Sequence, residues 1–202
     1  MCFFSNLSQT PAKLEKRFQA QFPDVSGYQP GDLNAFAFPA TPIIINKDPR
    51  TILMGNWGLI PHWAKDMTIR KYTLNARVET IREKPSFRSS VNNRCLIPAD
   101  AFYEWQWLDS KGKNKQKYRI CTADKQTFAF AGIFSMRFDP NTGQESLTYS
   151  ILTTAANEFM SEIHNSKKRM PIVLPKDLEG EWLANRLEAK QVPEVALTAV
   201  VT

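Results

Sequence analysis

The sequence predicts an α+β fold, a mostly antiparallel and barrel-like β-structure with flanking helices, formed by a single compact domain over residues 1–202. Three observations support this prediction. Strand-like segments fill the middle of the chain, helical patterns lie towards its ends, and the two do not alternate as they would in a βαβ protein. A length of 202 residues is ample for one domain with a hydrophobic core.

The first predicted helix has an apolar face made by Leu14, Phe18 and Phe22. Prolines and a Gly-Asp pair then indicate a loop at 28–42. Later segments rich in apolar residues indicate strands, and two periodic segments near the end indicate helices. In chain order we expect a helix at 12–22, strands at 41–46, 51–57, 95–98, 116–121, 127–137 and 147–153, and helices at 154–164 and 176–189.

Three turns are predicted between these strands. Lys47–Arg50 joins the first two strands as a hairpin, and the charged segment DSKGKNK at 109–115 joins two later ones. The segment FDPNTGQE at 138–145 is the third turn.

The net charge of +6 favours a polyanionic partner, although many soluble proteins carry a similar surplus. Basic residues gather at 77–94, 111–119 and 167–169 without forming a long run, so we expect a folded groove rather than a disordered arm. The N-terminus does not resemble a signal peptide, and no apolar run is long enough for a membrane span. We expect a monomer in the cytoplasm, associated with the nucleoid.

Three widely spaced cysteines in such a chain argue against a disulfide framework. With only two histidines, no zinc-ligand spacing occurs, and we expect neither a metal nor a cofactor. Cys95 and Cys121 lie in apolar strands and are expected to be inert buried thiols.

Cys2 is the residue with the most distinctive chemistry. Removal of Met1 would leave a free α-amine and a thiol on adjacent carbons, and the amine would be partly neutral near pH 7. Such a pair can attack one aldehyde carbon twice, first forming a Schiff base and then closing a thiazolidine ring. The position alone favours an accidental second residue.

Several motifs give Cys2 a context. They are Met1-Cys2, NWGLIPHW at 56–63, LNARVET at 74–80, RCLIPADAFYEW at 94–105, Ile163-His164 and RMP at 169–171. In this order and over nearly the whole chain, the motifs resemble those of the SRAP family, the abasic-site processing proteins. The resemblance implies a largely β fold with a positively charged groove for single-stranded DNA and an N-terminal cysteine at the floor of that groove.

The resemblance also implies roles for individual residues. Cys2 would be the nucleophile for the aldehyde of an opened abasic sugar, and Asn75 would orient it. Glu104 and His164 would transfer protons, as Schiff-base formation and its reversal require. Arg77 would hold a phosphate through its planar guanidinium group.

Trp63 is expected to stack on a base, and Arg169 to contact DNA. Two departures from the family pattern stand out. Many members begin Met-Cys-Gly-Arg, whereas Phe3 and Phe4 follow Cys2 here, and three extra residues separate His164 from Arg169. The lysines among the extra residues would offset the missing arginine.

Other interpretations remain open at this stage. Asn75 is equally suited to a turn, and His164 is suited to capping a helix C-terminus. Without the resemblance, a solvent-facing strand position is the favoured interpretation of Glu104. Trp57 and Trp105 are more typical of a core than of a DNA surface, and Arg77 of a surface ion pair.

Two other functions also remain open. A cysteine hydrolase would pair a Cys2 thiol with the His164 imidazole, although no Gly-rich oxyanion turn follows Cys2. The other function is non-covalent binding of single-stranded nucleic acid. The leading hypothesis is a crosslinking enzyme for abasic sites, lyase- or hydrolase-like, with self-release and a peptidase-like activity.

Overall fold

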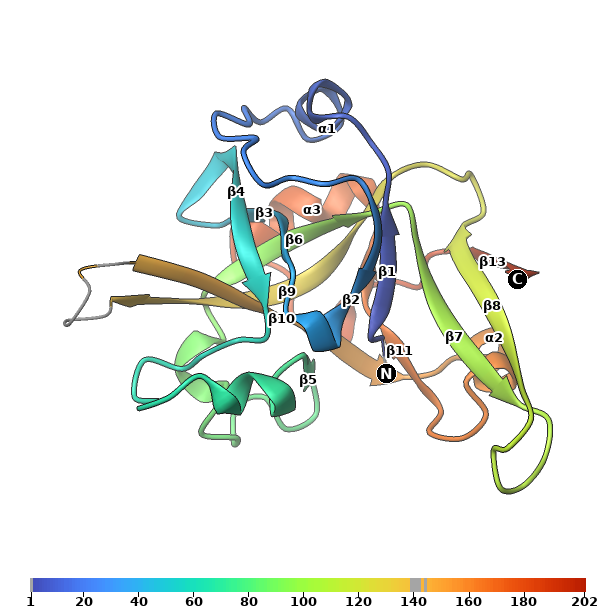
Figure 1. Cartoon of the computed structure of the whole chain (residues 1–202). Helices are drawn as coiled ribbons and strands as arrows, with labels where there is room; N and C mark the ends of the chain where they lie inside the picture. Colours follow the sequence, from blue (N-terminus) through green and yellow to red (C-terminus); the bar gives the residue numbers. More distant parts are fainter. Residues whose placement is uncertain (1, 139–142, 144) are drawn as a thin grey trace.

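A computed structural model describes residues 2–138, 143 and 145–202 of the chain. It confirms the predicted fold class, since the structure is mostly antiparallel β with a few short helices (Figure 1). The strands are β1 (Phe4–Leu7), β2 (Gly31–Asn34), β3 (Ala40–Ile45), β4 (Asp48–Trp57), β5 (Asn75–Arg77), β6 (Arg94–Ala99), β7 (Ala101–Trp107), β8 (Lys115–Thr122), β9 (Phe128–Phe138), β10 (Glu145–Ala155), β11 (Arg169–Pro171), β12 (Val173–Leu174) and β13 (Leu197–Val201). The α-helices are α1 (Pro11–Phe18), α2 (Glu158–Ile163) and α3 (Glu179–Leu183).

The strands form two sheets. The first has the order β13-β8-β7-β1-β2, and all of its neighbouring strands are antiparallel. In the second sheet, β10, β4, β3, β6 and β9 are paired in succession, and β9 pairs again with β10. This additional pairing closes five strands into a ring, which is the barrel that the sequence predicted. Closure also removes the open edges that would otherwise invite aggregation.

The core lies within the ring and between the sheets. Trp57 is buried as predicted, and its indole N–H donates to the carbonyl of Leu74 at 2.8 Å. The ring of Trp57 stacks on that of Tyr149 with centroids 6.1 Å apart, and the Tyr149 hydroxyl bonds to that of Thr41 at 2.8 Å. The polar ends of these large side chains are therefore satisfied inside the barrel.

All six predicted strands are confirmed as β3, β4, β6, β8, β9 and β10. The predicted turn at 109–115 is also found, with Lys115 already in β8. The turn at 47–50 is shorter than predicted, because β4 begins at Asp48. Of the predicted turn at 138–145, residues 139–142 and 144 lie outside the described residues.

The helices are shorter than predicted because tertiary pairing overrides the apolar periodicity. The helix at 12–22 ends at Phe18, where Gln19 takes a left-handed φ of 51°, and Gln21 then pairs with β4. Most of 176–189 is likewise not α-helical, since only α3 forms after a 3-10 turn. At 154–164, β10 continues to Ala155 and only the remainder becomes α2.

Several strands were not predicted. The loop expected at 28–42 contains β2 and a 3-10 turn at Ala35–Ala37, and both β1 and β7 were missed. β1 is only four residues long, which gives too few positions for an alternating pattern. Among the described residues, no helix combines the length and apolar character needed to cross a bilayer.

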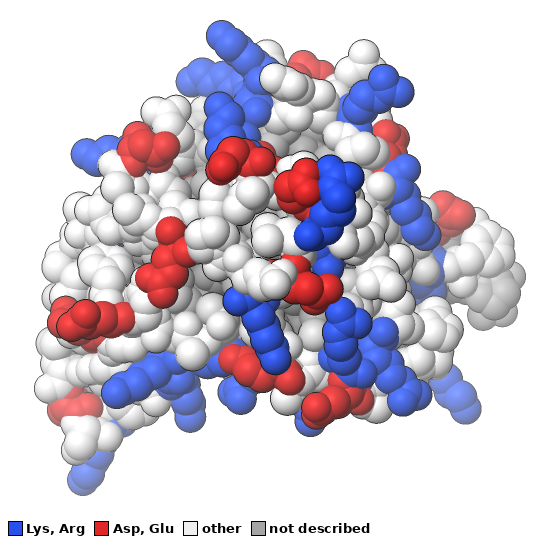
Figure 2. All heavy atoms as spheres, turned by 180° about the vertical axis from the view of Figure 1, so that it is seen from behind, with Lys and Arg blue, Asp and Glu red and all other residues white. Residues whose placement is uncertain are grey.

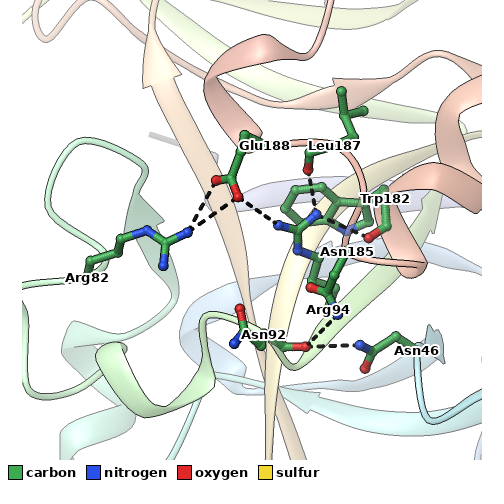
Figure 3. Close-up of polar contacts among 8 residues, drawn as sticks. All are labelled: Asn46, Arg82, Asn92, Arg94, Trp182, Asn185, Leu187 and Glu188. Carbon is green, nitrogen blue, oxygen red and sulfur yellow. Dashed lines mark hydrogen bonds and ion pairs between the residues drawn. The ribbon is translucent and has the colours of Figure 1, made fainter.

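A buried arginine fixes the C-terminal segment to the barrel (Figure 3). The guanidinium of Arg94, on β6, lies 4.2 Å from the ring centre of Trp182 and donates to the carbonyls of Trp182 and Leu187 at 3.3 and 2.5 Å. It also pairs with Glu188 at 3.7 Å, and Glu188 in turn pairs with the exposed Arg82. Burial lowers the pKa of Arg94, so this charge depends on its partners.

We predict that Arg94→Met lowers the free energy of unfolding by more than 2 kcal/mol, since each buried carbonyl left without a donor costs about 1–3 kcal/mol. Urea denaturation measures this change. Arg82→Met is the matched control, because it removes an exposed partner of the same Glu188 and should cost about 0–1 kcal/mol. Equal losses in the two variants would contradict a structural role for the buried arginine.

Candidate active site

Cys2 lies two residues before the start of β1, at the junction of the two sheets. Its side chain is buried, and the thiol lies 3.8 Å from the carbonyl oxygen of Phe4. The Asn75 amide donates to the Cys2 carbonyl at 2.9 Å. Asn75 begins β5, which runs parallel to β10 in the other sheet, and Figure 1 shows β5 beside the start of β1. This hydrogen bond therefore connects the start of the chain to the barrel.

Glu104 is on β7, the antiparallel neighbour of β1, and its carboxyl group is buried. The alternative of a solvent-facing strand position is therefore wrong. Burial raises the pKa of Glu104 to about 7, because the charged form loses its hydration. Burial and the negative charge of Glu104 both raise the pKa of the Cys2 thiol, so the thiol is neutral near pH 7.

His164 caps the C-terminal end of α2, as the helix-terminus alternative expected. Its Nδ1 lies 2.8 Å from the carbonyl oxygen of Arg169, and its Nε2 lies 3.8 Å from a carboxylate oxygen of Glu104. Burial lowers the pKa of the imidazole, so a neutral ring faces the carboxyl group near pH 7. Glu104 and His164, 60 residues apart in sequence, thus form a buried carboxyl–imidazole pair.

Asn165 is a residue that the sequence analysis did not identify. It is the first of the four residues between His164 and Arg169, and its amide makes two hydrogen bonds to the backbone of Trp107. The Asn165 oxygen accepts from the Trp107 N–H at 3.0 Å, and the Asn165 nitrogen donates to the Trp107 carbonyl at 2.9 Å. The extra segment is therefore attached to β7, three residues beyond Glu104, and holds His164 near it.

Arg169 is buried rather than displayed on a groove. Its guanidinium forms a bidentate pair with Glu79 at 2.6 and 3.0 Å and donates to the Thr153 carbonyl at 2.8 Å. These partners explain the burial of Arg169 without DNA. Its predicted contact with DNA stays a prediction.

The other two candidate DNA contacts are accessible. Arg77 is exposed on β5, two residues from Asn75, and Trp63 is 49% exposed with its indole N–H 3.3 Å from the Pro85 carbonyl. On the rear face of the molecule, acidic side chains lie among the basic ones (Figure 2). That face therefore offers no uniformly positive surface, whereas Arg77 lies beside the buried cluster.

The site combines a thiol with a proton donor and a proton acceptor, held by strands of both sheets. In the described part of the chain, no three metal-binding side chains gather at one place. All three cysteines are free and buried. The arrangement suits nucleophilic chemistry that also requires proton transfer.

The fold and the site together define a class: mostly antiparallel β proteins in which a cysteine at the start of the chain is buried beside a carboxyl–imidazole pair. This chain belongs to the family described as SOS response associated peptidase (SRAP), which matches residues 1–200. The resemblance found in the sequence motifs is thereby confirmed.

The chain is similar to several known proteins. It is 50% identical over 128 residues to the abasic site processing protein YoaM of Bacillus subtilis, covering 63% of this chain and 54% of YoaM. It is 31% identical over 146 residues to the abasic site processing protein YedK of Escherichia coli, covering 72% and 60%. A crystal structure of a protein from Bacteroides thetaiotaomicron matches 99% of this chain and 91% of its own, with 36% identity and a TM-score of 0.88. The chain spans about half the length of the curated relatives it matches.

The raised pKa of Glu104 predicts a pH-dependent difference in stability between the protein and its Glu104→Gln variant. Between pH 4.5 and 7 the folded protein keeps a proton that the unfolded chain releases, so the wild type loses stability as pH rises through this window. The free energy of unfolding of the wild type minus that of the variant should therefore fall by up to about 3 kcal/mol between pH 4.5 and pH values above 7. The size follows because a pKa change of one corresponds to about 1.4 kcal/mol. Urea unfolding from pH 4.5 to 8 measures this, with the exposed Glu83→Gln as control, and a pH-independent difference would contradict a buried carboxyl group.

The attachment of Asn165 predicts a change at His164. Asn165→Ala should release the extra segment from β7, expose the imidazole and raise its pKa towards the ordinary value. NMR titration of the imidazole protons measures this, and the exposed His62 is an internal reference because the chain has only two histidines. Ser166→Ala is the control. An unchanged His164 titration would show that Asn165 does not hold the imidazole in place.

Proposed function

We propose that this protein captures abasic sites in single-stranded DNA by forming a thiazolidine between the sugar aldehyde and Cys2, after Met1 has been removed. The observation that carries the proposal is the buried junction at Cys2. There, Asn75 holds the Cys2 carbonyl, and Glu104 lies close enough to influence the thiol and 3.8 Å from His164. The names of the relatives, which process abasic sites, agree with this chemistry.

The reaction begins at the α-amine. Because the buried Cys2 thiol is protonated and weakly nucleophilic near pH 7, the neutral amine attacks the aldehyde carbon first. The carbinolamine loses its hydroxyl group as water and becomes an imine. The sulfur then adds to the imine carbon, and the thiol proton is transferred to the ring nitrogen. One water is released for each crosslink formed.

Glu104 and His164 would carry the protons. A carboxyl group with a pKa of about 7 is partly protonated at neutral pH, so Glu104 can protonate the departing hydroxyl group and later accept a proton. The neutral imidazole of His164 would take up the thiol proton during ring closure. The same groups, acting in reverse, would allow slow self-release. Crosslink formation and its reversal together would make up the lyase- or hydrolase-like activity that the sequence predicts.

The DNA backbone would pass Arg77 and reach Trp63. Arg77 is exposed beside the site and can hold a phosphate, and the exposed indole of Trp63 can stack on an unpaired base. Single-stranded DNA suits this arrangement because its bases are free to stack. A cysteine hydrolase is less well supported, since burial keeps the thiol of Cys2 protonated.

The proposal predicts that the stable crosslink requires both the amine and the thiol of Cys2. Untagged protein incubated with abasic single-stranded DNA should give a complex that survives a denaturing gel. Its mass should equal that of the protein without Met1 plus the DNA, minus one water. Cys2→Ala and Cys2→Ser should abolish the stable complex, although borohydride should still trap an imine.

An extra residue placed before Cys2 converts its amine to an amide and is the decisive variant. Such a protein keeps the thiol but should not form the stable crosslink. Cys95 and Cys121 remain in every variant and serve as internal controls, since neither carries an α-amine. Crosslinking by the extended protein would falsify the thiazolidine mechanism.

A further inference from the structure

An aromatic cluster lies on the outer face of the five-stranded sheet, immediately beside the start of the chain. We call Phe4, Phe36 and Trp105 the aromatic platform. Phe36 is 54% exposed, and Phe4 and Trp105 are partly exposed, so the expectation that Trp105 belongs to the core is wrong. The aromatic rings therefore meet solvent instead of closing the interior.

The platform is built from contacts between rings. Phe4 lies 5.0 Å from Trp105 and 6.4 Å from Phe36, in edge-to-face arrangements, and Phe3 lies 4.9 Å from Phe36. The 3-10 turn that carries Phe36 is fixed by Asn34, whose side chain accepts from the Phe36 N–H at 3.0 Å. The rings are thus held in place before any ligand arrives.

Basic side chains border the platform. Trp105, Tyr103 and their neighbours on β7 face Lys117 and Arg119 on β8, and the Lys117 ammonium lies 5.8 Å from the Trp105 ring and 4.2 Å from the Tyr103 ring. In the described part of the chain, neither Lys117 nor Arg119 lies within salt-bridge distance of a carboxylate. The acidic Asp32 on this face is already bonded to Asn6 and Tyr103.

Side-chain alternation along β7 places the aromatic platform close to the proposed reaction site but on the opposite face of the sheet. Glu104 and Trp105 are consecutive on β7, so their side chains point to opposite faces of the sheet. Glu104 points to the buried junction and Trp105 to the platform. Phe4 follows Cys2 by two residues, so at most about 7 Å separates their Cα atoms.

We infer that the aromatic platform is a second DNA contact, on which a base flanking the site at Cys2 stacks while Lys117 or Arg119 meets the adjacent phosphate. This inference rests on the proposed function, because that function places the abasic site at Cys2. The stacking of a base on the exposed rings does not depend on the covalent chemistry. Single-stranded DNA fits because it offers flat apolar bases and negative phosphates in alternation, and the platform with its border offers aromatic rings and two cations that have no carboxylate within salt-bridge distance among the described residues.

The platform also explains the unusual start of the chain. The family pattern implied by the sequence motifs has Gly-Arg where Phe3 and Phe4 stand here. In this chain, stacking on Phe4 and Phe36 takes the place of a phosphate contact at that position. DNA binding should therefore depend more on the presence of a flanking base, and less on salt concentration, than it would with an arginine at this position.

The test removes the ring and the base separately. Wild type and Phe36→Ala are each titrated with three single-stranded DNAs. The first is undamaged, the second carries one tetrahydrofuran abasic analogue, and the third carries a second analogue in place of one base beside the first. The second analogue is placed in turn on either side of the first. At one of these positions it should weaken wild-type binding about five-fold or more, since stacking of one base typically contributes this much. The Phe36→Ala variant should bind less tightly and should not respond to the loss of that base.

Phe138→Ala is the matched control, because it removes another ring, 60% exposed, at the end of β9. It should behave as the wild type does. Lys117→Ala should in addition reduce the slope of log affinity against log salt by about 0.7. Equal sensitivity of wild type and Phe36→Ala to the flanking base would overturn the inference.

A denaturing gel with the same variants separates this inference from the proposed function. If wild type forms no stable crosslink but Phe36→Ala still loses its response to the base, the covalent mechanism fails and the platform stands. If wild type and Phe36→Ala crosslink alike at every DNA concentration and bind undamaged DNA equally, the covalent mechanism stands and the platform fails. Thermal unfolding of each variant confirms that it is folded.

Discussion

The hydrogen bond from the Asn75 amide to the Cys2 carbonyl is the constraint on which the candidate site depends. It joins the short β5 of the barrel sheet to the residue two positions before β1 of the five-stranded sheet. β1 is held by its pairing with β2 and β7, whereas Cys2 precedes that pairing, and chain ends are normally mobile unless they are tied down. A side-chain amide suits this role because it donates to a backbone carbonyl without adding a charge to a buried junction.

Burial at that junction is the common cause of the pKa shifts at the site. It raises the pKa of Glu104 to about 7, lowers that of His164 and raises that of the Cys2 thiol. In each case the charged form is disfavoured, so near neutral pH the site holds few fixed charges and can move protons readily. The buried carboxyl group of Glu104 lowers the stability of the folded protein near neutral pH, and such shifted pKa values are common at functional sites.

The departures from the family pattern are structurally compensated. The extra residues after His164 do not displace the imidazole, because Asn165 attaches them to the backbone of Trp107. The aromatic residues after Cys2 pack against Phe36 and Trp105 and leave their rings partly exposed. Arg169, by contrast, is committed to Glu79 and Thr153 and belongs to the framework that holds β11 beside β10.

The sequence by itself determined the fold class, six of the strands and the family, because alternating apolar segments and ordered motifs are local properties of the chain. It also named Cys2, Asn75, Glu104 and His164 as candidates. Only the tertiary structure decided that these four gather at one buried junction, that Arg169 is internal and that Trp105 lies on an outer face. Burial, and therefore every pKa shift at the site, depends on strands far apart in sequence. The same long-range pairing shortened the helices and formed β1, which is too short to show a pattern of its own.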